Sequence, residues 1–194
     1  HIMATASGTI QSARMAADML PDRDIRTVDS LTTSWGLGFL AVAAAQMAKL
    51  GRTRDEILDF LDRAKRKVNI HVVIPDLTLQ RRSGRVNLGQ AMMAGLLSIK
   101  PIIHFNEGRM PVVDKVRSLS RAVDRMIELA AETAGTNRVK LAVLHANAPD
   151  QARAILERVK TQFNIVEAFI AEMGSTIASH GGQGTMALAT FQVD

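Results

Sequence analysis

Strand-like and helix-like hydrophobic patterns alternate along the whole chain of 194 residues. Runs rich in β-branched residues predict strands at 25–28, 70–74, 100–105, 109–113, 139–145, 164–172 and 186–191. Apolar residues at helical spacing predict helices at 9–20, 34–50, 53–67, 87–97, 118–134 and 148–162. Because such an alternation lets helices cover the faces of a sheet, the chain is predicted to have a layered α/β fold.

Short local signals set several boundaries in this pattern. Ser34 is expected to cap the apolar helix that follows it. Thr53 and Glu56 have the spacing of a capping box, which predicts the start of the next helix. Gly108 supplies the positive φ that a turn between the strands at 100–105 and 109–113 requires, so these strands are predicted to form a hairpin.

The organisation of the chain changes near Asn69. Residues 4–68 are interpreted as part of a doubly wound, parallel-sheet α/β domain, and residues 69–194 as a C-terminal α+β domain that contains the hairpin. The first three residues, His1-Ile2-Met3, are interpreted as a cloning remnant outside the fold, because the first Met is not the first residue.

The core of this fold must be aliphatic, because the chain has no Tyr, one Trp, six Phe and ten Met. The absence of Cys excludes disulfides and thiolate chemistry, and it fits a cytoplasmic protein. A net charge of +5 is small, and one Trp and six Phe provide few aromatic rings on which nucleic-acid bases could stack. Nucleic-acid binding is therefore disfavoured. The most apolar stretch, 35–48, is shorter than the roughly 20 residues of a membrane span and is predicted to be a buried helix.

Three segments carry candidate anion-binding groups. The stretch 174–184 holds four glycines around His180, so that backbone N–H groups and an imidazole can approach an anion; a plain turn with a solvated histidine is the alternative. Ser7 lies at the start of a helix, where it either helps to bind an anion or simply caps the helix. Arg117 follows the hairpin. Its guanidinium either binds a carboxylate or phosphate through two parallel hydrogen bonds, or it is simply solvated.

Other polar residues have weaker interpretations. The basic run 81–85 suits an acidic partner or forms a solvated turn. His71 and His104 fall in apolar strands and are expected to be interior histidines rather than ligands, and no histidine or carboxylate pair has convincing metal spacing. The methionines on apolar helix faces fill the core or line a cavity for a flexible apolar ligand.

These residues leave several functions open. One is an enzyme, a hydrolase or transferase that uses His180 with Ser175, Ser179 or Ser7 as nucleophile. The chain has no Gly-x-Ser-x-Gly elbow, however, and no carboxylate is evidently placed to orient the histidine. Another is a regulatory or nucleic-acid-binding module, which the scattered basic residues and the missing aromatic rings disfavour.

The order of motifs resembles the DegV family, the bacterial fatty-acid-binding proteins. The segments that carry the resemblance are Ser7-Gly-Thr-Ile-Gln-Ser-Ala13, Val28-Asp-Ser-Leu-Thr-Thr-Ser-Trp-Gly-Leu-Gly38, Leu79-Gln-Arg-Arg-Ser-Gly-Arg-Val86, Leu97-Ser-Ile-Lys-Pro-Ile102, Gly108, Lys115-Val-Arg117 and His180-Gly-Gly-Gln-Gly184. Together they span almost the whole chain.

The resemblance implies a two-domain α/β protein that buries one long-chain fatty acid between its domains and has no catalytic residue, metal or cofactor of its own. Ser7, Arg117 and His180 match the positions that bind the carboxylate of the acid. Some family members present the bound acid to an ATP-dependent fatty acid kinase, and Arg85 is expected on the face that meets this partner.

Two departures from the family pattern stand out. Gln183 replaces a proline, which loosens the segment that carries His180. Family members also carry a further stretch before the Ser-Gly-Thr motif, so the N-terminal domain is expected to be incomplete here. A sheet without its first strands exposes an edge, so the chain is expected either to close that edge by self-association or to lack a stable ligand site.

Overall fold

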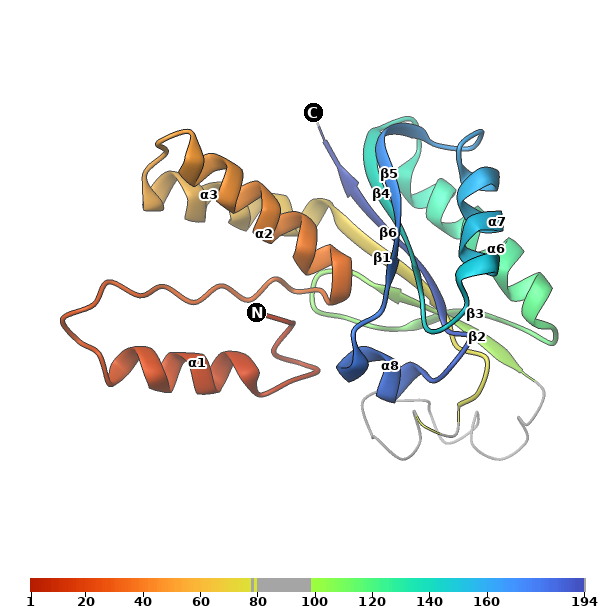
Figure 1. Ribbon diagram of the computed structural model, residues 1–194, viewed down its shortest axis with the longest axis horizontal. Coiled ribbons are helices and arrows are strands. Elements are labelled where there is room, and N and C mark those ends of the chain that lie inside the picture. Colours follow the sequence, from red (N-terminus) through yellow and green to blue (C-terminus); the bar gives the residue numbers. More distant parts are fainter. Residues whose placement is uncertain (78, 80–98, 194) are drawn as a thin grey trace.

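The computed structural model describes residues 1–77, 79 and 99–193, which form one six-stranded sheet with helices on both faces (Figure 1). The strands are β1 (Val68–Val73), β2 (Lys100–Phe105), β3 (Val112–Val116), β4 (Arg138–His145), β5 (Asn164–Glu172) and β6 (Met186–Gln192). The helices are α1 (Thr9–Asp18), α2 (Ser34–Lys49), α3 (Arg54–Ala64), α6 (Leu119–Ala134), α7 (Pro149–Val159) and α8 (Ser175–Gly181), with a 3₁₀ turn, η1 (Lys65–Lys67), after α3. The predicted α/β class is confirmed.

The strands lie in the order β3-β2-β1-β6-β4-β5. The pair β4 and β5 is parallel and connected by α7, in agreement with the strands expected at 139–145 and 164–172 and the helix between them, while the other neighbouring pairs are antiparallel. The hairpin itself is confirmed, since β2 and β3 are antiparallel and Gly108 in their connection has a φ of 75°. Its second strand, expected at 109–113, is Val112–Val116, because Arg109 pairs only with Asn106 in an isolated bridge of the turn. The helix expected at 87–97 lies outside the described residues.

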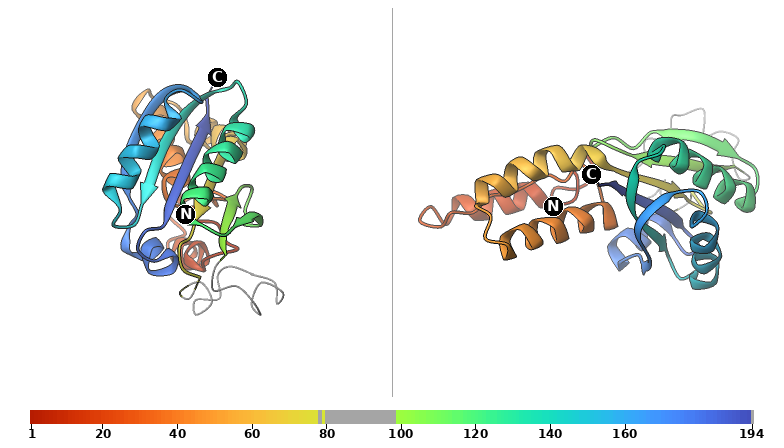
Figure 2. Two further views of the ribbon diagram at one scale, coloured as in Figure 1. Left: turned by 90° about the vertical axis from the view of Figure 1, so that its right-hand side faces the viewer. Right: turned by 90° about the horizontal axis from the view of Figure 1, so that it is seen from above.

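Alternating side chains of the strands divide the core into two layers. Ile70 and Val72 of β1 pack in the layer that α2 and α3 cover, whereas Val73 packs in the layer of α6 and α7. Figure 2 shows that α1, α2 and α3 form a lobe that extends beyond one side of the sheet. The proposed boundary near Asn69 falls inside β1, because Asn69 is the second residue of that strand and follows this lobe directly.

Local signals placed most helix starts correctly. Thr53 and Glu56 form the predicted capping box, in which each side chain bonds to the other residue's backbone N–H. The start of α2 differs by one residue: Thr33, not Ser34, is the N-cap, because Thr33 has the extended backbone of a capping position and Ser34 already belongs to the helix. The prediction that α2 is a buried helix holds only for its sheet-facing side, since Val42 is 43% exposed. In the described part of the chain, no helix is long and apolar enough to cross a membrane.

The predictions for the first 30 residues need two corrections. Residues 25–28 are extended but form no strand of the sheet, because their backbone meets only the short segment 1–3: the His1 amino group donates to the Val28 carbonyl at 2.8 Å. The two segments run in parallel, since Ser30 N–H donates to His1 O and Met3 N–H to Thr32 O. Residues 1–3 are therefore part of the fold, and the Met3 side chain is fully buried.

Candidate functional site

A cavity of about 300 Å³ lies between the sheet, the N-terminal segment, the start of α2 and the helix α8. Its floor is a row of three paired residues on adjacent strands, in which Ala187 of β6 lies between Val72 of β1 and Leu144 of β4. The small alanine leaves space between its larger neighbours. The remaining apolar lining residues are Ile2, Met3, Ala6, Ile70, Ile74, Phe105, Met110, Met173, Ile177 and Gly181.

Polar side chains also line this cavity, and they come from three separate parts of the chain. They are Ser7, Thr9, Thr33, Ser34, Thr176, His180 and Thr185. A mostly apolar cavity with a few polar groups is the usual form of a site for a small amphipathic ligand, and its volume is at the lower end of the range for such sites.

Ser7 sits where the chain enters α1. Its hydroxyl accepts a hydrogen bond from the Thr9 N–H at 3.2 Å and lies 2.8 Å from the Thr9 hydroxyl. The N-cap of α1 is Gly8, which has no side chain to cap the helix. Two hydroxyls therefore stand together at the first turn of α1, beside the cavity.

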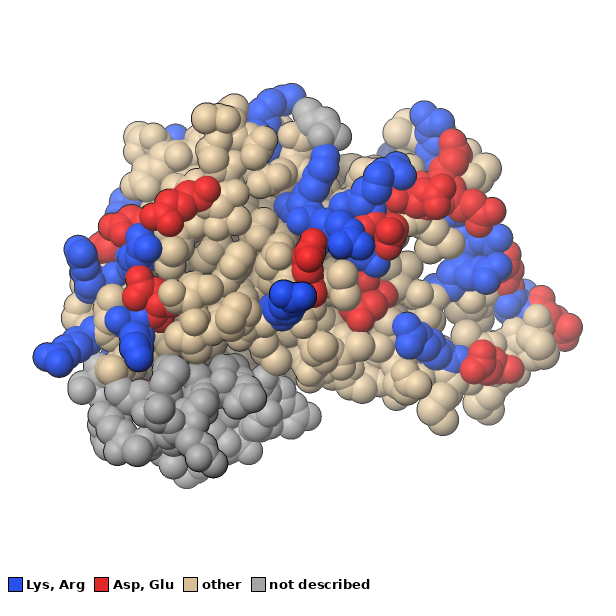
Figure 3. Space-filling view, turned by 180° about the vertical axis from the view of Figure 1, so that it is seen from behind, with Lys and Arg blue, Asp and Glu red and all other residues tan. Residues whose placement is uncertain are grey.

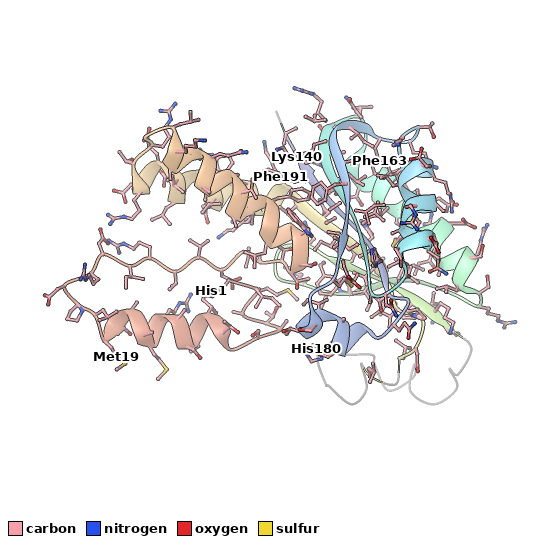
Figure 4. The ribbon with its side chains drawn as sticks, viewed as in Figure 1. His1, Met19, Lys140, Phe163, His180 and Phe191 are labelled. Atoms are coloured by element: carbon pink, nitrogen blue, oxygen red, sulfur yellow. The ribbon has the colours of Figure 1, made fainter. Side chains whose placement is uncertain are left out.

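His180 lies in the last turn of α8, close to the point where residues 1–9 lead into α1 (Figure 4). Within the glycine-rich stretch 174–184, residues Ser175–Gly181 form this short helix, which closes with a 2.7 Å bond from Gly182 N–H to the Ala178 carbonyl. A Cβ on Gly181 would lie 2.8 Å from the Thr185 hydroxyl, so glycine is required there. The glycines thus set the path of the backbone that positions His180.

The structure brings Ser7 and His180 to one cavity, but not Arg117. Arg117 directly follows β3, which is an edge strand of the sheet and pairs with β2. The Arg117 side chain is exposed and does not line the cavity. Its predicted contact with a carboxylate therefore stays a prediction. Arg85, predicted to meet a partner protein, lies outside the described residues.

Thr33 and Ser34 were not predicted as site residues. The Thr33 side chain lines the cavity, is only 6% exposed, and has no hydrogen-bond partner for its hydroxyl among the described residues. The sequence has a Thr-Thr-Ser run directly before an apolar helix, which could have indicated this position. The same run is also typical of an ordinary helix cap.

His71 and His104 are interior residues of neighbouring strands, away from this cavity. Their rings stack 4.2 Å apart, and His104 Nε2 lies 2.9 Å from the Asn69 side-chain oxygen. Burial, and to a smaller extent the charge of His104, lowers the pKa of His71 to about 3. Burial also lowers the pKa of His104. Among the described residues, no group of three or more potential ligand side chains could hold a metal ion.

Known proteins resemble this chain over nearly all of its length. A DegV domain-containing protein of Halalkalibacterium halodurans is 34% identical over 192 residues, which are 98% of this chain and 68% of that protein. A structure described as "Fatty Acid Binding of a DegV family Protein from Thermus thermophilus" has a TM-score of 0.90 at 29% identity, covering 100% of this chain and 69% of the other. The structure of DegV, a fatty acid binding protein from Bacillus subtilis, has a TM-score of 0.87 at 30% identity and the same coverage.

The chain spans about two thirds of the length of the curated relatives it matches. The family described as "Uncharacterised protein, DegV family" matches residues 1–193, which is all of the chain except its last residue. With the matching fold and the shared motifs, this establishes that the chain belongs to the DegV family.

Proposed function

We propose that this protein binds one long-chain fatty acid, with the acyl chain in the cavity above β1, β6 and β4 and the carboxylate beside Ser7 and His180. The observation that carries the proposal is the convergence of these two side chains, 173 residues apart in sequence, on one mostly apolar cavity. The fatty acids bound by the Thermus thermophilus and Bacillus subtilis relatives support the same ligand class.

The chemistry of the cavity fits a carboxylic acid better than a neutral lipid. An imidazole and a hydroxyl can each donate a hydrogen bond to a carboxylate, and hydrogen bonds to a charged group are about twice as strong as neutral ones. The apolar walls remove the acyl chain from water, which favours binding by about 25 cal/mol for each Å² of apolar surface buried.

We further propose that the protein carries the acid and does not transform it. Two of the three candidate nucleophiles already make local bonds: Ser179 donates to the Thr176 carbonyl at 2.8 Å, and the Ser7 hydroxyl lies 2.8 Å from the Thr9 hydroxyl, which can act as the donor and leave the Ser7 proton for a carboxylate. In this proposal, an ATP-dependent fatty acid kinase phosphorylates the presented carboxylate in the cytoplasm, and Arg85 contacts that kinase. Basic and acidic side chains are mixed on the face seen in Figure 3, which does not favour nucleic acid as a partner on that side.

Native mass spectrometry of the protein purified from bacteria tests the binding proposal. We expect a co-purifying ligand of about 250 to 300 Da, the mass of a C16 to C18 acid, as fits a cavity of this class. Protein that carries no such mass and does not bind added palmitate would overturn the proposal.

Two further measurements address the finer parts of the proposal. Arg117→Ala should weaken palmitate binding by about 10- to 100-fold if this guanidinium reaches the carboxylate in solution. An unchanged dissociation constant would remove Arg117 from the site.

ATP and palmitate should yield acyl phosphate only when a fatty acid kinase is added, and turnover by this protein alone would make it an enzyme.

Self-association through the exposed edge at the N-terminal segment is the last part of the proposal. Segments 1–3 and 28–32 run side by side in parallel. Segment 28–32 makes one further backbone bond, from Gly108 N–H to the Leu31 carbonyl at 2.7 Å, and no strand of the sheet in the described part of the chain extends the pairing. Exposed backbone of this kind favours pairing with another chain. A monomeric sedimentation profile at micromolar concentration would contradict it.

A further inference from the structure

The N-terminus of α2 is the second polar feature of the cavity. This helix has 16 residues, and no acidic side chain lies in its first turn. The first N–H groups of a helix have no acceptor within the helix, and they form the positive end of the helix dipole. The N-cap residue Thr33 would normally accept one of these bonds, but its side chain makes no such bond.

The Thr33 hydroxyl is instead buried at the cavity with no partner. It is 6% exposed, and its oxygen makes no hydrogen bond to any described residue. A buried hydroxyl without a partner destabilises the folded protein, and native structures usually provide each such group with a partner. Since Thr33 lines the cavity, a bound ligand can be that partner.

The position of this helix start is fixed from two sides. The Trp35 ring packs edge-on against Phe169 of β5, with ring centroids 4.5 Å apart. On the sheet side, a Cβ on Gly36 would lie 2.5 Å from the Thr32 hydroxyl and 2.9 Å from Val68, so the helix backbone lies unusually close to β1. Groups held this rigidly need little ordering when a ligand binds, which favours affinity.

We propose that the N-terminus of α2, with the hydroxyls of Thr33 and Ser34 as donors, binds the ionised carboxylate of the acyl ligand and makes the protein select free acids over neutral esters. This inference rests on the proposed fatty-acid binding and adds a determinant of its specificity. The helix dipole stabilises a full negative charge, whereas a methyl ester of the same chain length carries none. The first turn of α2 thereby supplies positive potential to a cavity that Arg117 does not line.

The test compares palmitate with methyl palmitate in binding titrations of the full chain. Thr33→Val removes the hydroxyl at nearly constant shape and should weaken palmitate binding by about 10- to 100-fold, the range for a hydrogen bond to a charged group, and leave the ester affinity within about threefold. Thr33→Ser keeps the hydroxyl and should retain palmitate affinity. Thr32→Val is the matched control, because Thr32 also has a buried hydroxyl without a partner among the described residues but does not line the cavity.

The outcomes separate this inference from the function on which it rests. If the unmodified chain binds neither lipid, the proposed function fails and this inference fails with it. If it binds palmitate and Thr33→Val binds palmitate equally well, or loses both lipids equally, the function stands and the role of α2 is overturned. Should Thr33→Val fail to fold, amide chemical shifts of the unmodified chain decide the matter: palmitate, but not its ester, should move the N–H resonances of residues 34–36, and unmoved resonances would overturn the inference.

Discussion

Acid should destabilise this protein mainly through the buried His71, with a smaller contribution of the same sign from its neighbour His104. His71 is 2% exposed and lies between the His104 ring, 4.2 Å away, and the Thr133 hydroxyl, 3.5 Å from its Nε2. Its Nδ1 has no hydrogen-bond partner among the described residues. Burial and the neighbouring His104 lower the pKa of His71 from 6.5 to about 3, so the folded protein holds this ring neutral.

The sign and size of the effect follow from proton binding. Between the two pKa values the unfolded chain binds a proton that the folded protein does not, so stability falls as the pH falls from 6.5 toward about 3. For these values, the free energy of unfolding should fall by about 2 kcal/mol between about pH 7.5 and about pH 5. Most carboxylates stay ionised in this window, so they contribute little to the change.

Urea denaturation of the protein and of His71→Leu at these two pH values tests this reasoning. The parent protein should lose about 2 kcal/mol of stability on acidification, and His71→Leu should lose much less, whatever its stability at neutral pH. A variant that shows the same loss as the parent would refute the assignment, since the titrating group would then lie elsewhere.

Three further substitutions test the cavity and the fold. Ala187→Leu should fill the space beside Leu144 and weaken palmitate binding at least tenfold, with a circular dichroism spectrum like that of the parent; unchanged affinity would place the acyl chain elsewhere. Thr53→Ala should lower the unfolding free energy by about 1 kcal/mol through loss of the capping box, and no change in urea midpoint would contradict this. Gly181→Ala should destabilise by about 1 to 3 kcal/mol, because its Cβ would meet the Thr185 hydroxyl, and a stabilised variant would count against the packing described.

Features set by neighbouring residues were predictable from the sequence. The capping box at Thr53, the hairpin around Gly108 and the strands on either side of α7 depend on contacts within a few residues or on a single supersecondary unit. Hydrophobic periodicity reports such units directly. The glycine-rich stretch and the helix start already indicated His180 and Ser7, the motif resemblance gave both the same role, and the fold brings them to the same cavity.

Features set by distant contacts were not predictable in this way. Residues 25–28 have a strand-like sequence, yet a strand also needs a neighbour of sufficient length, and here the neighbour is only the segment 1–3. The site role of Thr33 depends on its hydroxyl facing a cavity and not its own helix, which no local pattern reveals. Arg117 carries a motif match, but sequence alone does not show that its side chain is exposed beyond β3.

The division of the cavity into an apolar floor and a polar end assigns two kinds of selectivity to different residues. Burial of an acyl chain is favourable in proportion to area and has no direction, so the floor around Ala187 can select chain length but not the head group. The polar end is built from segments that are each held by their own contacts: Ser7 by Thr9, α2 by the Trp35 and Phe169 rings, and His180 by the turns that close α8. Hydrogen-bond donors fixed before the ligand arrives distinguish a charged carboxylate from a neutral group most strongly, because little free energy is spent on ordering them. Substitutions on the floor should therefore change the ranking of acids by length, whereas substitutions at the start of α2 should change the ratio of acid to ester binding.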